Sequence, residues 1–182
     1  MFATADGPAV FRLSEHLRRL DRSTRMIRME LPYGTDDLAK ATVDLVRADS
    51  HRARYLRHFA FPGYGSVGEC TGENVFAARD GVLRTPPTSA GALEGITQDT
   101  VLTLARGLGL PVRVEGLLRS DLYAADELFV CGTAAGVVPV RSLDDRELPT
   151  APGPVTTRLR EAYEAAVSGA DPRYRHWLTP VG

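Results

Sequence analysis

The chain has 182 residues, of which 43% are hydrophobic and 25% charged, a balance typical of a soluble globular protein with one domain or two small ones. Its formal net charge of −1 argues against nucleic acid as a partner, and no apolar run is long enough to span a membrane. The N-terminus has no signal-peptide pattern, and the two cysteines, Cys70 and Cys131, lack metal-ligand spacing. We therefore expect a cytoplasmic protein without a metal site.

Strands and helices alternate in the first part of the chain. Ser14 suits the N-cap of the first helix, which carries Leu17 and Leu20 on one face. Lys40, the only lysine in the sequence, falls on what we expect to be the outer face of the second helix. The expected elements are a strand, two helices and another strand, at residues 9–13, 14–25, 36–48 and 53–61.

A glycine-rich stretch follows at residues 63–72, where we expect the backbone to pass close to another group. The pair Asp80-Gly81 then predicts a β-hairpin. The later elements are expected to be strands at 74–78 and 82–85, a helix closed by Gly107 and Gly109, a strand at 111–118, a short helix from Ser120, three strands within 127–148 and a final helix at 153–169. Helices and strands mixed in this way predict an α/β or α+β fold.

Two segments have the composition of ligand-binding turns. Gly95, Ile96 and Thr97 stand at the start of a predicted helix, where unpaired N–H groups and a partial positive charge favour phosphate. Thr97 also suits a plain N-cap. The small residues of Cys131–Gly136 would let the backbone approach a ligand, although a tight turn explains them equally well.

Taken in order, seven segments resemble one family, the branched-chain amino acid aminotransferases, which are fold-type IV pyridoxal-phosphate (PLP) enzymes. The segments are FRLSEHLRRLDRS, RYLRHFAF, ECTGENVF, LEGITQDTV, ADELFVCGTAAGVVPVR, GPVT and HWLTPV. The resemblance implies a shortened class IV aminotransferase fold of mixed α/β type. Residues 1–68 would be a remnant of the smaller α/β domain, and residues 69–182 the later half of the larger, barrel-like domain.

The resemblance also implies a site for the phosphate of PLP. Arg19 is similar to the arginine that pairs with this phosphate in the family. Gly95, Ile96, Thr97 and Thr133 resemble the rest of the phosphate-binding turn and helix start.

Further matching positions concern the cofactor ring and the substrate. Glu69 resembles the acid that faces the pyridine nitrogen and keeps it protonated, so that the ring can accept electrons. Tyr55 and Arg57 resemble residues on the substrate side, and Thr133 and Ala134 resemble backbone donors to the substrate carboxylate. The implied small-molecule partners are an amino acid and a 2-oxo acid.

One part of the family pattern is missing from this chain. Gly68 runs directly into Glu69, whereas the family has a long stretch there with the Schiff-base lysine and a tyrosine that bonds the cofactor oxygen. The chain also begins after the family's first strands. Arginine cannot replace the lysine, because its guanidinium stays protonated. We therefore expect no catalytic residue for transamination, and only weak, non-covalent binding of PLP.

Three functions remain open at this point. The first is an aminotransferase that moves the amino group of Leu, Ile or Val to 2-oxoglutarate, with impaired activity. The second is a non-catalytic relative that binds phosphate or a PLP-like ligand, or pairs with a full-length aminotransferase. The third is a protein with chemistry that needs no lysine. Missing interior strands would expose sheet edges, so we expect a homo-oligomer or association with a related chain.

Overall fold

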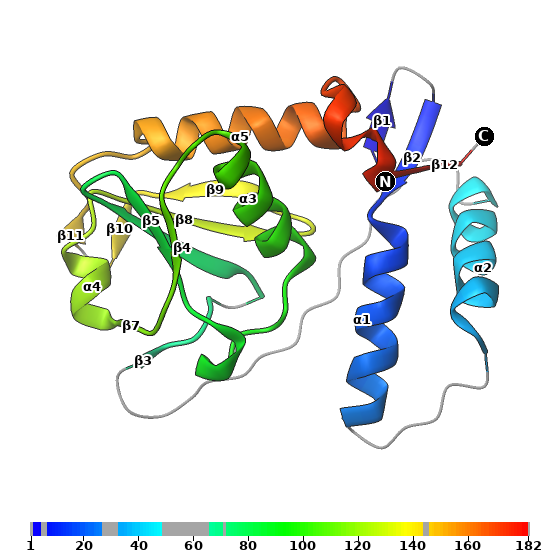
Figure 1. Ribbon diagram of the computed structural model, residues 1–182, viewed down its shortest axis with the longest axis horizontal. Helices are drawn as coiled ribbons and strands as arrows, with labels where there is room; N and C mark the ends of the chain where they lie inside the picture. The colour runs from blue at the N-terminus through cyan, green and yellow to red at the C-terminus, as the bar shows by residue number, and fades with distance from the viewer. Residues whose placement is uncertain are drawn as a thin grey trace. The chain divides into compact units, whose positions relative to one another are not determined.

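The computed structural model describes residues 2–4, 7–26, 33–48, 66–70, 72–143 and 146–181. The chain forms two compact units. Unit 1 comprises Met1–Tyr55 with Glu164–Gly182, and unit 2 comprises Leu56–Tyr163. Both units combine helices with strands, as expected for a mixed α/β fold (Figure 1). Among the residues described, no helix has the length and apolar character needed to cross a membrane.

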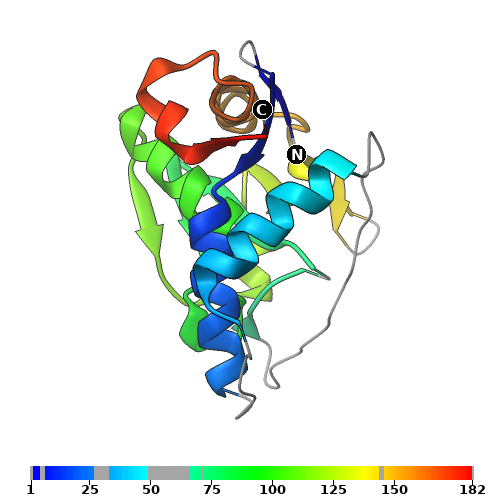
Figure 2. The ribbon, with the colours of Figure 1, turned by 90° about the vertical axis from the view of Figure 1, so that its right-hand side faces the viewer.

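Unit 1 contains a small antiparallel sheet and two neighbouring helices. In the sheet, β2 lies between β1 and β12, and Phe11 of β2 pairs with Leu178 of β12. Figures 1 and 2 both show helix α2 beside helix α1. Lys40 is exposed on α2, as the sequence predicts. The elements of this unit are β1 (Phe2–Thr4), β2 (Gly7–Phe11), α1 (Leu13–Met26), α2 (Thr35–Ala48), the 3₁₀ helix η2 (Pro172–Trp177) and β12 (Leu178–Pro180).

The junction between β2 and α1 differs from the sequence prediction. The strand ends at Phe11, and α1 begins at Leu13, so the predicted cap residue Ser14 already lies inside the helix. The reason is a left-handed turn at Arg12, with φ of 51°. The Arg12 N–H donates to the carbonyl of Trp177 over 2.6 Å, which fixes this turn against η2. Of the two leucines expected on one face, Leu17 is buried but Leu20 is 43% exposed.

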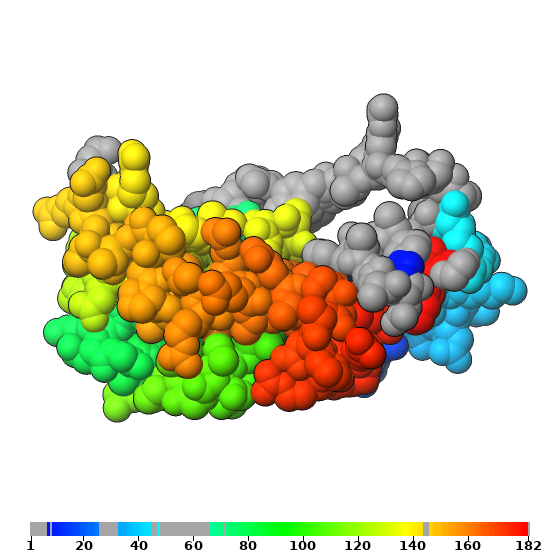
Figure 3. Space-filling model, turned by 90° about the horizontal axis from the view of Figure 1, so that it is seen from above, coloured from blue at the N-terminus to red at the C-terminus, as the bar shows by residue number. Residues whose placement is uncertain are grey.

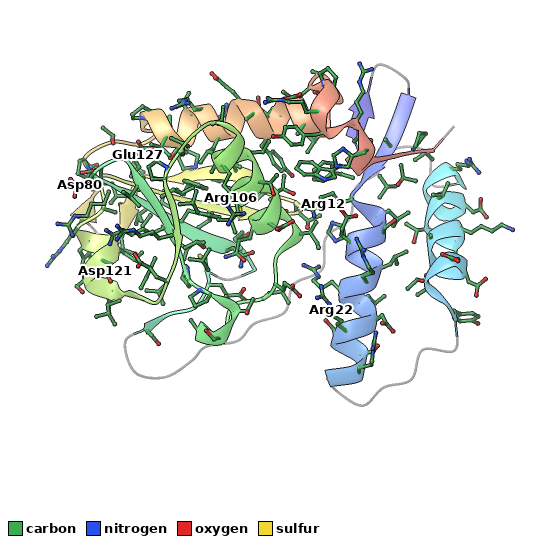
Figure 4. The ribbon with its side chains drawn as sticks, viewed as in Figure 1. Arg12, Arg22, Asp80, Arg106, Asp121 and Glu127 are labelled. Carbon is green, nitrogen blue, oxygen red and sulfur yellow. The ribbon has the colours of Figure 1, made fainter. Side chains whose placement is uncertain are left out.

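The side chain of Trp177 is packed on several sides within unit 1. Tyr174 stacks on it with ring centroids 4.5 Å apart, and Phe11 meets it edge-on at 5.7 Å. The Arg12 guanidinium lies 5.0 Å from the Trp177 ring centroid, while its Nε donates to Glu15 Oε1 over 3.0 Å (Figure 4). A buried arginine is tolerated here because both its charge and its donors have partners.

Unit 2 is built on a five-stranded sheet with the strand order β6-β5-β4-β8-β9. The predicted hairpin is confirmed, because β4 and β5 pair antiparallel across Asp80 and Gly81, with φ of 51° and 73°. The strands are β4 (Asn74–Arg79), β5 (Val82–Thr85), β6 (Val112–Val114), β8 (Glu127–Gly132) and β9 (Gly136–Val140).

The single strand predicted for residues 111–118 is wrong, since the segment divides between two sheets. Its first half, β6, pairs parallel with β5 at the edge of the large sheet. Its second half, β7 (Leu117–Leu118), pairs with β3 (Ser66–Val67), directly before the Gly68–Glu69 junction. The Glu115 N–H donates to Thr85 O over 3.1 Å, and the chain then leaves the large sheet at Gly116.

Helices cover the large sheet and complete its core. Helix α3 (Ile96–Gly107) packs on β8, and Val101, Leu104 and Ala105 are buried as the helical spacing predicts. Phe76 and Phe129 stack 4.9 Å apart at the centre of the core. The remaining elements of this unit are η1 (Thr88–Ala90), α4 (Arg119–Tyr123), β10 (Ser142–Leu143) and β11 (Arg146–Glu147), with α4 starting one residue before the predicted Ser120.

The first part of α5 (Pro154–Val167) is held to unit 2 by a buried carboxylate. Glu127 is 3% exposed, and its two oxygens accept hydrogen bonds from Val155 N and Thr156 N, at 3.0 and 2.9 Å. Figure 4 shows Glu127 beside the first turn of this helix. A carboxylate at a helix N-terminus satisfies the unpaired N–H groups and interacts favourably with the helix dipole. The outer face of these first turns is exposed in Figure 3.

Candidate functional site

The candidate site lies in unit 2, where one end of the large sheet meets the start of α3. In the register of the sheet, Asn74 at the start of β4 is opposite Cys131 near the end of β8. Gly132 at the end of β8 is opposite Gly136 at the start of β9. The β8–β9 turn and the start of β4 therefore lie at the same end of the sheet.

The N-cap of α3 is Gly95, so the prediction of Thr97 as N-cap is wrong. Thr97 is the second helical residue, and it is 5% exposed. A Cβ atom on Gly95 would lie 1.9 Å from Asn74 Oδ1, so only glycine fits at this position. Because glycine has no side chain, the N-cap residue forms no side-chain hydrogen bond with the first turn. The N-cap residue therefore adds no side-chain charge or acceptor to the first turn, whose acidic residue is Asp99.

The segment before α3 is held at Leu93 by two side chains. The Leu93 N–H donates to Glu69 Oε2 over 2.7 Å. On the other side, Asn74 Nδ2 donates to the Leu93 carbonyl over 3.0 Å. Glu69 is half-buried, while Asn74 is 5% exposed. These contacts connect the residues that follow the Gly68–Glu69 junction to the start of α3.

Tyr163 of α5 reaches the same helix start from another direction. Its side chain is hydrogen-bonded to that of Thr97. Burial, with the neighbouring Cys131 as a smaller cause, raises the pKa of Tyr163 to about 12, although the Thr97 hydrogen bond acts in the opposite sense. A Cβ atom on Gly136 would lie 3.3 Å from Tyr163 Cε1. Tyr163 thus contacts both the first turn of α3 and the start of β9.

The buried thiol of Cys131 is held in its neutral form. Burial raises its pKa far above the ordinary range, and the carboxylate of Glu73 raises it further. Cys131 is 0% exposed. A protonated, buried thiol is a poor nucleophile, so Cys131 serves packing rather than chemistry.

The sequence-predicted residues divide into three groups by their placement. Gly95, Ile96 and Thr97 come together with Glu69, which is connected to them through Leu93. The second group is Thr133 with Ala134, which are both exposed in the β8–β9 turn. The third is Arg19 alone, which is half-buried on α1 of unit 1. The predicted convergence of Arg19 with the phosphate site stays a prediction.

Two further predictions concern the substrate-side residues and the absence of a metal site. Tyr55 and Arg57 fall outside the described residues. Within the described ranges, His, Cys, Asp and Glu form no group of three or more that could hold a metal ion.

The sequence prediction missed the parts played by Asn74 and Tyr163. Tyr163 follows Leu159 by four residues on the buried face of α5, and a buried tyrosine hydroxyl usually needs a partner. Asn74 is a polar residue at the start of an apolar strand, which likewise signals a specific hydrogen bond. Neither signal identifies the partner, because both partners are distant in sequence.

Comparison with known proteins points to one family. A family model for amino-transferase class IV matches residues 61–143. A branched-chain-amino-acid aminotransferase from Salmonella typhimurium is 42% identical over 138 residues, which cover 75% of this chain and 45% of that protein. The chain therefore spans about half the length of this curated relative.

A second relative extends the similarity to nearly the whole chain. The branched-chain-amino-acid aminotransferase of Pseudomonas aeruginosa is 28% identical over 264 positions, covering 99% of this chain and 86% of that protein. The match is longer than the 182 residues of this chain, so it crosses positions that have no counterpart here.

A solved structure covers the chain completely. The crystal structure of the branched-chain amino acid aminotransferase from Thermobaculum terrenum, in its PLP form, is 32% identical, with a TM-score of 0.88. The match covers 100% of this chain and 86% of that chain. The ordered motifs, the mixed α/β fold and these similarities lead to one conclusion: the chain belongs to the class IV aminotransferases, in the branched-chain amino acid aminotransferase family.

Proposed function

We propose that this chain binds a PLP-type cofactor without a covalent bond and transfers amino groups from Leu, Ile or Val to 2-oxoglutarate slowly or not at all. The observation that carries the proposal is the position of its only lysine. Lys40 is exposed on α2, and Gly68 runs directly into Glu69, so no lysine stands where the family has its Schiff-base lysine. The family's lysine both holds the cofactor and moves a proton, so its loss removes two contributions.

The residues at the start of α3 suit the phosphate group of such a cofactor. Gly95 adds no side-chain cap, and the partial positive charge of a helix N-terminus, which Asp99 in the first turn offsets in part, favours an anion. We assign phosphate binding to Gly95, Ile96 and Thr97, together with Thr133 from the β8–β9 turn. Arg19 would add a charge-assisted hydrogen bond, which is typically about twice as strong as a neutral one.

The ring and the substrate would be held by other side chains. When bound, PLP supplies an electron-accepting ring that stabilises negative charge at the substrate Cα. We assign Glu69 to the pyridine nitrogen, because its carboxylate is already oriented by the Leu93 N–H over 2.7 Å. Tyr55 and Arg57 are assigned to the substrate side, and the backbone of Thr133 and Ala134 to its carboxylate.

Proton transfer at the substrate Cα is the step that this chain supports poorly. Two ionisable side chains near the candidate site have raised pKa values, namely Tyr163 beside the start of α3 and Cys131 near the end of β8. Both side chains therefore stay protonated near neutral pH. Neither accepts a proton under those conditions. General acid–base assistance is typically worth about 10²–10⁴ in rate, so its loss leaves transamination weak.

The test is the formation of glutamate from leucine and 2-oxoglutarate with saturating PLP. We expect the rate to stay near that of the reaction without protein, and to be the same in a Lys40→Ala variant. Robust turnover in both proteins would show that the lysine is not needed. Turnover that is lost only in Lys40→Ala would show that Lys40 reaches the site.

We also propose that the chain associates with itself or with a related chain in the cytoplasm. Two observations support association: Val114 on the edge strand β6 is 49% exposed, and Val138 on the opposite edge strand β9 is 39% exposed. Both cysteines are free thiols, which suits a reducing compartment. Sedimentation velocity over a range of concentrations distinguishes a homo-oligomer from a 19.8 kDa monomer. A monomer at all concentrations would contradict self-association.

A further inference from the structure

Asn74 lies at the meeting point of the candidate site, yet it has no assigned part in the proposed function. It is the first residue of β4 and is 5% exposed. Its side chain carries a donor and an acceptor, and both lie against the segment that leads into α3. A buried carboxamide placed in this way is stabilising only where its polar atoms are used.

The donor side of Asn74 acts on Leu93. Asn74 Nδ2 donates to the Leu93 carbonyl over 3.0 Å, while the N–H of the same residue donates to Glu69 Oε2 over 2.7 Å. The leucine side chain itself is 50% exposed, so packing contributes little to its position. The backbone of Leu93 is therefore held mainly between the carboxamide of Asn74 and the carboxylate of Glu69.

The acceptor side of Asn74 acts on the start of α3. Oδ1 occupies the space beside Gly95, where a Cβ atom would lie only 1.9 Å away. The Gly95 carbonyl in turn accepts the first helical hydrogen bond, from Asp99 N over 3.0 Å. One side chain thus sets both the position of the Glu69 partner and the point at which the helix begins.

We propose that Asn74 is a positioning residue, which holds Glu69 and the first turn of α3 in a fixed relation so that one phosphate-bearing ring ligand contacts both. The inference rests on the proposed function, which assigns Glu69 to the ring and the helix start to the phosphate. It implies that pyridoxamine 5'-phosphate binds more tightly than inorganic phosphate, since it uses both contacts. Loss of Asn74 then reduces this preference.

The first measurement compares the two ligands by calorimetric titration in the parent chain and in Asn74→Ala. Pyridoxamine 5'-phosphate is chosen because it has no aldehyde, so it reports non-covalent contacts alone. We expect the affinity ratio of pyridoxamine 5'-phosphate to phosphate to fall by about tenfold in Asn74→Ala, as for the loss of one oriented hydrogen bond to a charged group. Asn74→Asp keeps the side-chain size but loses the donor, and should lower the ratio similarly.

Gln98→Ala is the matched control. Gln98 is also a buried carboxamide near the start of α3, but its Nε2 donates to Thr85 Oγ1 over 2.9 Å, away from Leu93. We expect its affinity ratio to match that of the parent chain. An equal fall of the ratio in Gln98→Ala and Asn74→Ala would show a general loss of structure and would overturn the proposal.

The second measurement is hydrogen exchange of the Leu93 amide by NMR without any ligand. We expect faster exchange of this amide in Asn74→Ala than in the parent chain, and unchanged exchange in Gln98→Ala. Unchanged exchange in Asn74→Ala would contradict the proposal, as would faster exchange with an unchanged affinity ratio. If the parent chain does not prefer pyridoxamine 5'-phosphate, the proposed function fails, whereas Leu93 exchange still decides whether Asn74 holds the loop.

Discussion

The side chain of Tyr163 on α5 is hydrogen-bonded to that of Thr97 in the first turn of α3, and both residues are 5% exposed. This bond connects two helices that lie far apart in the sequence. It also engages a hydroxyl that we assign to phosphate binding. A threonine hydroxyl has one donor and can also accept, so Thr97 keeps its donor for an anion when Tyr163 is the donor in this contact.

Loss of this bond should lower stability at neutral pH. We expect Tyr163→Phe to reduce the free energy of unfolding by about 1 kcal/mol, the usual net value of one hydrogen bond. Urea denaturation at pH 7 measures the change. Tyr123→Phe, which removes an exposed hydroxyl of the same unit that accepts a hydrogen bond from Arg119 Nε over 2.9 Å, is the control and should have a smaller effect. Equal effects would indicate that the buried bond contributes nothing specific.

The raised pKa of Tyr163 predicts a loss of stability at alkaline pH. The unfolded chain releases this proton near the ordinary pKa of 10, whereas the folded chain keeps it until about 12. Its stabilising contribution is therefore complete below pH 10 and is lost as the pH rises to 12. We expect the parent chain to lose on the order of 1–3 kcal/mol more than Tyr163→Phe over this interval. Urea denaturation at pH 9 and at pH 11.5 tests this; parallel losses in both proteins would contradict it.

Substitution of Gly95 should be destabilising because of Asn74. The added Cβ of Gly95→Ala would lie 1.9 Å from Asn74 Oδ1, and we expect a loss of about 1–3 kcal/mol, as for other overpacked sites. In an Asn74→Ala background the same change should cost much less, which a double-mutant cycle measures. Gly116→Ala is the control, because a Cβ atom there meets nothing within 4 Å. Additive effects of the Gly95 and Asn74 changes would refute this explanation.

Removal of the buried carboxylate at the start of α5 should have a large effect on stability. Glu127 accepts hydrogen bonds from Val155 N, Thr156 N and Thr156 Oγ, the last over 2.7 Å. Glu127→Ala would leave these donors without their partner, and we expect a loss of about 2–4 kcal/mol. Thermal unfolding measures it, with the exposed Glu161→Ala on the same helix as control. A shift no larger than that of the control would show that water replaces the carboxylate at no cost.

Binding of pyridoxamine 5'-phosphate should depend on the hydroxyl of Thr97. We expect Thr97→Val to weaken the affinity by about tenfold, since a buried donor to a phosphate is lost. Thr103→Val, which makes the same change in the half-buried later part of α3, should bind like the parent chain. Calorimetric titration provides both values, and equal affinities for the two variants would remove Thr97 from the phosphate site.

Local patterns predicted the elements of unit 2 better than their contacts. The Asp80-Gly81 hairpin and the buried face of α3 follow from turn chemistry and helical spacing, which are properties of neighbouring residues. The segment 111–118 was predicted as one strand, because its residues do not indicate that it leaves one sheet for another after Glu115.

The candidate site shows the same division. Its glycines and threonines were predicted from the family resemblance, and the structure brings Gly95, Ile96 and Thr97 together with Glu69 through Leu93. The contacts of Asn74 and Tyr163 were not predicted. Asn74 reaches a backbone carbonyl 19 residues away, and no local pattern specifies a bond of that kind.

The pairing of β2 with β12 has a consequence for the order in which the chain folds during synthesis. Phe11 pairs with Leu178, so the central strand of this small sheet meets one of its partners only after residues 12–177 have been synthesised. Unit 2 is formed by one continuous stretch, Leu56–Tyr163, and is complete earlier. Because domains generally fold as units during synthesis, unit 2 is expected to form first, while β2 is paired on both sides only once β12 has been made.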